Sequence, residues 1–304
     1  MTNPPFVRRA VNIWRRQAHT NPTERVLTAL SVGAPRLASL LASAYPQPRD
    51  YALVDERLVE RRGGRWLLRP AHYFQWHLFF NHADPVLDVL CHLARSSRFA
   101  VDAGANVGVY SVLMALAMAE GAVHAFEPGP ETYERLVLHT HLNRAKNVTP
   151  IQRALGDQPG RLALTDSSQG DSGKASLRAQ PQGSMVAEVE VTTLDAHMES
   201  LGLTALDLLK IDVEGHEPAL LRGAQHALKA QPWLVLEFSP QWYDDADLAV
   251  FRDLEEMGYG FFEIDGPPVV LRPVSLSVLF ARRQQCNLLG VPPRYRTVQL
   301  PWRR

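Results

Sequence analysis

Residues 101–110 read Val-Asp-Ala-Gly-Ala-Asn-Val-Gly-Val-Tyr, and this stretch decides the fold. An apolar run ends at Asp102, glycines follow, and a second apolar run of helix length begins near Val109. This order is typical of a buried strand that turns directly into a helix. In such a turn, backbone N–H groups and the helix N-terminus face a polar or anionic ligand group. We therefore expect a cofactor to bind at this turn.

The spacing within the turn separates two classes of cofactor. A dinucleotide pyrophosphate needs the pattern G-x-G-x-x-G, but Asn106 replaces the second glycine and Gly108 comes one residue early. The alternative is a nucleoside cofactor without a pyrophosphate. Asp102, Gly104 and Asn106 suit the methionine end of S-adenosylmethionine, which is the cofactor that we expect.

A second strand end supplies a carboxylate. Glu127 lies 25 residues after Asp102 and ends an apolar run, where it can accept hydrogen bonds from both ribose hydroxyls. Dinucleotide-binding folds use a carboxylate in the same way, so this residue alone does not choose between the cofactors. Either carboxylate taken singly could simply be a residue that caps a strand or a helix. The two together, in this order and spacing, indicate cofactor binding.

From Phe99 onward, short apolar runs alternate with amphipathic stretches of helix length, which is typical of βα units around a mostly parallel sheet. Strands are predicted at 99–103, 123–127, 148–154, 206–211, 234–238 and 259–264. The run 276–281 follows without room for a crossover helix and is predicted as an antiparallel last strand. Helices are predicted after Pro130 and Pro218. Residues 160–193 are predicted to form a mobile loop between two extra strands.

The first part of the chain is predicted to be an accessory region. Prolines separate short helical patterns there, and paired glycines at Gly63 and Gly64 predict a β-hairpin over residues 58–69. We expect three segments: the accessory region at 1–95, a catalytic domain at 96–285 and a tail at 286–304. The basic, mildly amphipathic stretch 6–16 could contact an acidic membrane surface or could be a solvated terminal helix.

Composition excludes several classes of protein. Lys plus Arg and Asp plus Glu both total 32, so the net charge is zero and nucleic acid is not an expected partner. Two distant cysteines can build neither a disulfide framework nor a thiolate zinc site, and they favour a reducing, cytoplasmic setting. No apolar run reaches the length of a membrane span, and the N-terminus lacks the pattern of a signal peptide.

The chain resembles the FkbM-type methyltransferases. The resemblance rests on five motifs in the family's order, which are Val101-Asp-Ala-Gly-Ala-Asn-Val-Gly, Ala125-Phe-Glu-Pro-Gly-Pro-Glu-Thr-Tyr-Glu-Arg-Leu, Ala154-Leu-Gly-Asp, Thr193-Leu-Asp and Leu209-Lys-Ile-Asp-Val-Glu-Gly-His-Glu-Pro-Ala-Leu-Leu-Arg-Gly-Ala. They cover roughly residues 98–240.

The resemblance implies a Rossmann-like class I methyltransferase fold with a seven-stranded, mostly parallel sheet. It also implies O-methyl transfer from S-adenosylmethionine, with Asp102, Gly104 and Asn106 at the methionine end, Glu127 at the ribose and Asp157 near the adenine. Asp157 could instead be only a turn residue.

A second cluster of chemical groups follows the fourth predicted strand. Ligands in open α/β sheets lie beyond the carboxyl ends of the strands, so Asp212 and Glu237 should border the site. Asp212 or His216 could accept the proton of a hydroxyl acceptor. Alternatively, Asp212 and Glu237 could hold a divalent metal that acidifies this hydroxyl. His216 could also be a surface residue at a helix start, and Glu217 is assigned mainly to capping that helix.

Aromatic residues give a weaker indication of the acceptor site. The run 72–80 is expected mainly to pack the accessory region onto the sheet, and it could also cover an acceptor pocket. Trp242 and Tyr243, directly after the fifth strand, are better candidates for the pocket wall. The expected activity is methyl transfer from S-adenosylmethionine to a hydroxyl of a small molecule or glycan. A nicotinamide-dependent oxidoreductase and a non-catalytic binding module remain as alternatives.

Overall fold

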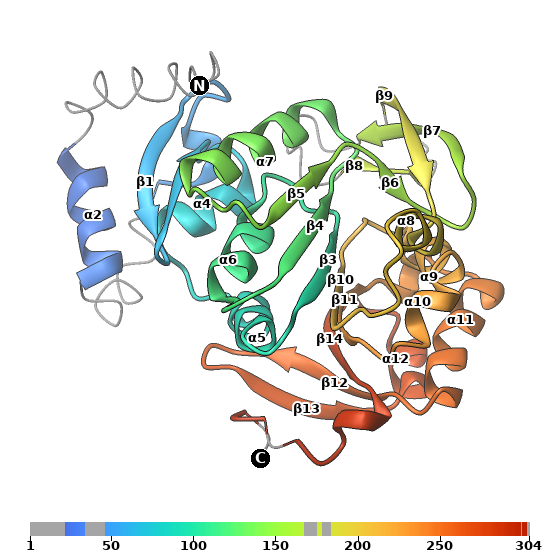
Figure 1. Cartoon of the computed structure of the whole chain (residues 1–304). Coiled ribbons are helices and arrows are strands. Elements are labelled where there is room, and N and C mark those ends of the chain that lie inside the picture. Colours follow the sequence, from blue (N-terminus) through green and yellow to red (C-terminus); the bar gives the residue numbers. More distant parts are fainter. Residues whose placement is uncertain (1–21, 34–45, 167–174, 178–183, 299, 303–304) are drawn as a thin grey trace.

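The structure is a computed structural model that describes residues 22–33, 46–166, 175–177, 184–298 and 300–302. Helices cover both faces of a large sheet, and a separate hairpin and a small second sheet lie beside it (Figure 1). None of the helices in these ranges combines the length and the apolar character needed to cross a bilayer. The basic stretch 6–16 lies outside the described residues.

The main sheet has eight strands in the described part of the chain, in the order β13–β12–β14–β11–β10–β3–β4–β5. The strands are β3 (Phe99–Ala103), β4 (Ala122–Phe126), β5 (Val148–Ile151), β10 (Leu208–Ile211), β11 (Trp233–Phe238), β12 (Gly260–Asp265), β13 (Val270–Val274) and β14 (Cys286–Val291). β5, β4, β3, β10 and β11 pair in parallel, whereas β14 lies antiparallel between β11 and β12. β3 and β10 are buried along their whole length, because helices cover both faces of the sheet. The predicted class I methyltransferase fold is confirmed, and β13 adds an edge strand to the seven that were expected.

The predicted last strand, residues 276–281, is wrong. This segment is part of helix α12 (Leu276–Arg282). Leu276 and Leu279 are buried whereas Val278 is 44% exposed, so the buried positions recur every three residues instead of alternating. The antiparallel strand is β14, which the boundary predicted at 285 would assign to a tail. The sheet therefore continues into the segment 286–304.

Two groups of helices pack against the sheet to form the two largest apolar cores of the described residues. The first group packs on one face of the sheet and comprises α5 (Pro85–Ala94), α6 (Val109–Ala117) and α7 (Pro130–Leu142). The second group packs on the other face and comprises α8 (Leu194–Ser200), α9 (Glu217–Arg222), α10 (Gln225–Leu228), α11 (Asp245–Glu256) and α12. Pro130 and Pro218 lie in the first turns of α7 and α9, as predicted. Short 3-10 turns occur at Pro48–Asp50, Pro240–Trp242 and Pro293–Tyr295.

The accessory region contains α2 (Pro22–Gly33), the hairpin strands β1 (Arg57–Arg61) and β2 (Gly64–Leu68), and α4 (Tyr73–Phe79). The hairpin is present as predicted, but its two-residue turn is Arg62–Gly63, one residue earlier than expected, because Arg61 pairs with Gly64. Both turn residues have positive φ, at 51° and 79°, as this kind of tight turn requires.

The two extra strands predicted within residues 160–193 are also present. The small sheet has the order β6–β9–β7–β8, formed by β6 (Ala154–Leu155), β7 (Gly160–Asp166), β8 (Ala175–Ser176) and β9 (Ser184–Thr192). The run predicted as one strand at 148–154 is divided between β5 in the main sheet and the start of β6 in this small sheet. The centre of the predicted loop, residues 167–174, lies outside the described residues.

Candidate functional site

Three residues with positive φ shape the turn between β3 and α6. Gly104, Asn106 and Gly108 have φ values of 76°, 50° and 85°. A Cβ atom on Gly104 would lie 1.7 Å from the carbonyl oxygen of Asp212, so only glycine allows the turn and the end of β10 to approach this closely. Gly108 begins α6, and a Cβ there would lie 2.5 Å from Leu136 of α7. The turn is therefore held in place by close packing on both sides.

Glu127 connects this turn to the end of β4. Its Oε2 accepts the N–H of Asn106 at 2.8 Å, and its Oε1 accepts the N–H of Gly129 at 2.9 Å and the hydroxyl of Thr132 at 2.7 Å. Burial raises the pKa of Glu127, while these hydrogen bonds act in the opposite direction. Three donors fix the orientation of the carboxylate and leave lone pairs for further donors, such as ribose hydroxyls.

A cavity of about 460 Å³ lies beyond the carboxyl ends of β3, β4 and β10, and we call it the cofactor cavity. Among its lining residues are the predicted Gly104, Asn106, Glu127, Asp212 and Glu237. Its other walls include Phe126, Pro128, Leu155, Leu164, Leu177 and Trp242. A largely apolar cavity with a few convergent polar groups is typical of a cofactor site. The structure thus brings together five of the residues that the sequence singled out.

Two predicted cofactor residues do not line this cavity. Asp102 is fully buried beneath the turn, where its Oδ2 accepts the hydroxyl of Ser111 at 2.5 Å. Asp157 is exposed and is absent from the cavity wall, so its placement near an adenine stays a prediction. Asp102 therefore acts on the turn from below, through its partners.

The chief partner of Asp102 is Lys210, which the sequence reasoning missed. The Lys210 Nζ lies 3.1 Å from Asp102 Oδ1 and 3.4 Å from Asp212 Oδ2, and it donates to the carbonyl oxygen of Gly104 at 2.7 Å. Burial alone would lower the pKa of Lys210, but the two carboxylates raise it above its ordinary value. A lysine inside a buried apolar strand was the available signal, because such a charge needs partners. Lys210 thus joins the turn to both strand-end carboxylates.

Asp212, Glu214 and Glu237 form an acidic cluster at the mouth of the cofactor cavity. One carboxylate oxygen of each lies within 4.8 Å of the others, so the three could hold a metal ion. Burial, together with the charges of Asp212 and Glu214, raises the pKa of Glu237 to about 9. Either a proton or a divalent cation would relieve this crowding of negative charge. The cluster extends the predicted pair Asp212 and Glu237 by one carboxylate.

His216 does not line the cofactor cavity. It stands at the N-cap of α9, and its imidazole lies against Gly156, where a Cβ atom would be 3.1 Å from Nε2. A general base must reach the proton that it removes. The structure therefore does not bring the imidazole to the place where the predicted catalytic role requires it.

Glu217 and Tyr243 have structural contacts. Glu217 is fully buried, its Oε1 accepts the N–H groups of Val213 and Gly215 at 3.1 Å, and its Oε2 accepts the hydroxyl of Tyr243 at 2.7 Å. These bonds fix the loop after β10. Glu217 therefore has a structural role, but its backbone donors lie in this loop and not in the first turn of α9, so the predicted capping of the helix is not what its side chain does. Of the two aromatic residues proposed for the pocket wall, Trp242 lines the cofactor cavity and Tyr243 is buried behind it.

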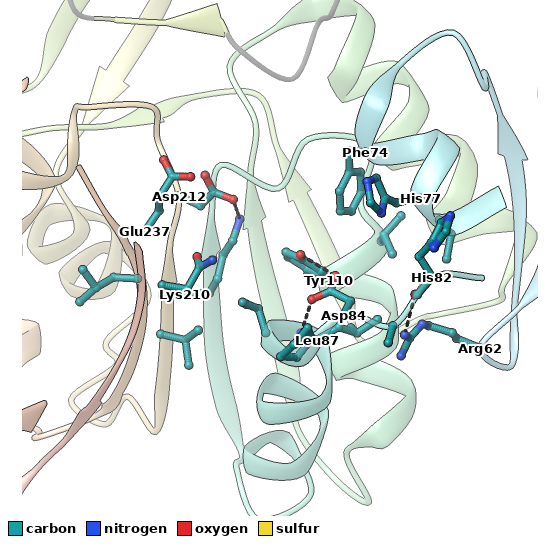
Figure 2. A pocket seen from close by; sticks show the side chains of 18 of the residues that line it. Arg62, Phe74, His77, His82, Asp84, Leu87, Tyr110, Lys210, Asp212 and Glu237 are labelled. Carbon is teal, nitrogen blue, oxygen red and sulfur yellow. Dashed lines mark hydrogen bonds and ion pairs between the residues drawn. The ribbon is translucent and has the colours of Figure 1, made fainter. Parts of the chain in front are cut away.

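A second cavity of about 450 Å³ adjoins the first (Figure 2). The two cavities share Tyr73, Phe74, Asp212 and Glu237 as lining residues. The rest of the second cavity is lined largely by the accessory region, α5 and the ends of β10 and β11, including Arg62, His77, His82, Asp84, Leu87, Val109, Tyr110, Lys210, Val235 and Asn287. The aromatic run 72–80 therefore has both predicted roles: Trp76, Phe79 and Phe80 are core residues, and the start of α4 covers the cavities.

Comparisons with known proteins identify the family of this chain. The chain is 29% identical over 245 residues to methyltransferase sdnD of Sordaria araneosa, covering 70% of this chain and 90% of that protein. It is 28% identical over 153 residues to the hexuronic acid methyltransferase AglP of Haloferax volcanii, covering 50% of this chain and 60% of that protein. Among solved structures, the O-methyltransferase TomG of Streptomyces achromogenes, in complex with S-adenosylmethionine, has a TM-score of 0.40 and 15% identity, covering 70% of this chain and 82% of TomG. Residues 102–261, more than half of the chain, match the methyltransferase FkbM domain. The chain belongs to the FkbM methyltransferase family.

Proposed function

We propose that this methyltransferase transfers the methyl group of S-adenosylmethionine to a hydroxyl group of a small molecule or glycan. The observation that carries this proposal is that two cavities adjoin at Asp212 and Glu237, and that one of them contains the glycine turn and Glu127. A cofactor in one cavity and an acceptor in the other would meet beside these carboxylates. This arrangement supplies the proximity on which transfer between two bound molecules depends.

The residues of the cofactor cavity fit S-adenosylmethionine. Gly104 and Asn106 of the glycine turn line this cavity, where backbone groups of the turn can face the methionine end. The Glu127 carboxylate is oriented for the ribose hydroxyls, and the apolar wall near Phe126, Leu155 and Leu164 suits a flat adenine ring. Asp157 remains a proposed adenine contact.

When bound, S-adenosylmethionine supplies an electrophilic methyl carbon on a positively charged sulfur. The protein must then orient the acceptor hydroxyl and accept its proton. Asp212 lines both cavities, and its side chain is 35% accessible, so a hydroxyl can reach its carboxylate. Lys210 holds this carboxylate from below. We assign proton acceptance to Asp212, and we do not retain His216 for this role.

The acidic cluster favours a hydroxyl over a carboxylate as the acceptor group. Like charges a few ångströms apart repel, so a carboxylate acceptor would be unfavourable beside Asp212 and Glu214. A hydroxyl carries no charge and has a proton to give. If the cluster with Glu237 holds a divalent cation, that cation would acidify the same hydroxyl. The name of one relative, a hexuronic acid methyltransferase, gives further support for a sugar acceptor.

Isothermal titration with S-adenosylmethionine and its demethylated product tests the cofactor. We expect saturable binding, with an affinity loss of about tenfold or more for Glu127→Gln, since a hydrogen bond to a charged group contributes roughly 1.5–3 kcal/mol. Glu188→Gln is the matched control, because Glu188 is an exposed carboxylate paired with Arg161 on the small sheet. Folded protein that releases no heat at high micromolar ligand would refute the proposal.

The same titration and a cellular test separate the two alternatives. The family assignment gives no support to a nicotinamide-dependent oxidoreductase, and binding of NAD(P)H in place of S-adenosylmethionine would restore that alternative. For a non-catalytic binding module, Asp102→Ala should leave the cellular phenotype intact while truncation of residues 1–50 abolishes it. The proposed enzyme requires that Asp102→Ala abolish this phenotype.

A further inference from the structure

The second cavity has a composition that the family assignment does not explain. We call it the acceptor chamber, and it is the cavity of about 450 Å³ that shares Asp212 and Glu237 with the cofactor cavity. Arg62 and His77 lie on the side away from Asp212, and Asp84 lies between Tyr110 and Arg62 (Figure 2). These three residues precede the family match, which begins at residue 102. This part of the chamber wall therefore comes from this chain's accessory region.

Aromatic packing fixes the histidines of the chamber. The His77 ring centroid lies 4.4 Å from that of Tyr73 and 5.1 Å from that of Trp76, and His82 stacks on Trp76 at 4.9 Å. Burial lowers the pKa of both histidines below the ordinary value, so both rings are neutral at pH 7. The His77 Nε2 is buried and makes no hydrogen bond within the described residues. A fixed neutral imidazole offers one donor and one acceptor to a ligand.

The charged side chains of the chamber disfavour an anionic ligand. Both cations in its wall already have carboxylate partners: Arg62 lies 3.0 Å from Asp88, and Lys210 lies 3.1 Å from Asp102. Asp84, in contrast, accepts hydrogen bonds from two neutral donors. Its Oδ2 accepts the Tyr110 hydroxyl at 2.8 Å, and its Oδ1 accepts the N–H of Leu87 at 3.0 Å.

The chamber therefore has two separate carboxylates in its wall, Asp84 and Asp212, together with apolar side chains. This wall includes Phe74, Leu87, Val109 and Val235. A ring with two apolar faces and hydroxyls around its edge would match such a surface, because carboxylate and imidazole groups bond hydroxyls while aromatic and aliphatic side chains cover the faces.

We propose that the acceptor chamber binds an uncharged, polyhydroxylated ring such as a hexosyl unit and discriminates against the corresponding uronic acid. The reacting hydroxyl lies at Asp212, Phe74 covers one face of the ring, and the outer hydroxyls bond His77 and Asp84. This assignment rests on the proposed methyl transfer and adds the class of acceptor to it.

A matched panel of acceptors tests this assignment in the full-length protein. The probes are methyl hexopyranosides and the methyl hexuronosides of the same configuration, and the readout is formation of demethylated cofactor above the acceptor-free rate. We expect at least one hexopyranoside to be used with kcat/KM at least about tenfold above its uronoside. Preference for the uronosides, or no response to either series, overturns the assignment. Titration of the cofactor in the same preparation keeps this outcome distinct from failure of the proposed function.

Two variants locate the selectivity. Asp84→Asn keeps a good N-cap for α5 and removes only the charge, so kcat/KM for the uronoside should rise about tenfold while cofactor affinity is unchanged. Asp244→Asn is the control, since Asp244 caps α11 in the same way and lines neither cavity. An unchanged ratio of the two acceptors in Asp84→Asn overturns the role of this charge.

His77→Phe keeps the aromatic contacts of the ring and removes its hydrogen-bonding atoms. We expect the KM for the hexopyranoside to rise about tenfold, because a ligand hydroxyl loses its partner, while the cofactor affinity and the melting temperature stay unchanged. His92→Phe is the control, because His92 also packs edge-on against an aromatic ring, that of Trp302, away from both cavities. A KM that stays within twofold of the unsubstituted protein would overturn the proposed contact.

Discussion

Removal of the Lys210 ammonium should destabilise the whole cofactor side of the fold. Lys210 is 3% exposed and Asp102 is fully buried, and their charged atoms lie 3.1 Å apart. Lys210→Met has a similar shape but no charge, so Asp102 would keep only its hydrogen bond from Ser111. The carbonyl oxygen of Gly104 would lose its donor at the same time.

The magnitude follows from the burial of both groups. Breaking a buried ion pair by removing one partner costs about 3–5 kcal/mol, mainly because the remaining charge is uncompensated. For a chain of 304 residues, an unfolding entropy of about 2.1 cal/mol/K per residue converts this loss to a fall of roughly 5–8 °C in melting temperature. Asp102→Asn in the Lys210→Met background removes the orphaned charge. The double variant should therefore recover at least about half of the loss.

The assay is a double-mutant cycle of Lys210→Met, Asp102→Asn and the double variant, followed by urea and thermal unfolding. Lys229→Met is the matched control, because Lys229 is exposed at the end of α10 and should change stability by no more than about 0.5 kcal/mol. The reasoning fails if Lys210→Met costs less than about 1 kcal/mol, or if the effects of the two single variants simply add.

Four further outcomes are expected. Gly104→Ala should destabilise the fold by about 2–5 kcal/mol in unfolding assays, from positive φ and overpacking, and it should abolish detectable cofactor binding, since its Cβ would meet Asp212. Asp212→Asn should lower turnover about a hundredfold, whereas His216→Ala should stay within about threefold, and a large loss in the latter would restore its catalytic role. Chelator followed by magnesium or manganese tests the acidic cluster: loss and rescue of turnover, with cofactor affinity unchanged, indicate a metal, and no effect indicates a bare carboxylate base. Burial and neighbouring charge raise the pKa of Glu237 to about 9, so between pH 4.5 and 9 the folded state holds a proton that the unfolded state has lost. The free energy of unfolding should therefore fall as the pH rises through this range. Glu237→Gln should flatten this fall, measured as urea midpoints at pH 5 and pH 8.

The parts of the site that the sequence predicted are those governed by local rules. The turn after β3 is determined by glycine spacing, and Glu127 and Asp212 directly follow buried apolar runs. Because parallel strands end at the same edge of a sheet, these residues meet whenever the strand order is right. Short-range pattern and one topological rule therefore predicted the glycine turn, Glu127 and Asp212 at the cofactor cavity. They predicted neither Lys210 nor the complete burial of Asp102 beneath the turn.

The C-terminal part of the fold needed more than local pattern. The run that forms α12 is short and apolar, and such a run is compatible with either a strand or a helix. Its state is settled by β14, which fills the antiparallel place between β11 and β12. Similarly, His216 stands four residues after Asp212 in sequence, but the loop fixed by Glu217 turns its ring toward Gly156. Sequence proximity to a strand end did not give the direction of this side chain.

The acceptor chamber depends on contacts between elements that are distant in sequence. Sequence patterns therefore predicted only its aromatic residues and the strand-end carboxylates Asp212 and Glu237. His139 of α7 donates through Nδ1 to the carbonyl oxygen of Val107 in the glycine turn, at 2.6 Å, and its Nε2 accepts the N–H of Leu67 in β2 at 3.1 Å. Burial, with the nearby Arg135 charge, lowers the pKa of His139 to about 4, so this ring stays neutral and keeps one tautomer.

One helix therefore holds the cofactor turn and the accessory hairpin in a fixed relation. Arg135, on the same face of α7, pairs with Glu56 at 2.9 Å just before β1, and both side chains are buried. The hairpin leads directly into α4, which carries Tyr73, Phe74 and His77 over the two cavities. Since the anchoring residues are separate from the chamber residues, substitutions in the chamber can change which acceptor binds without moving the cofactor. This separation is the physical reason why the selectivity variants proposed above should leave cofactor affinity unchanged.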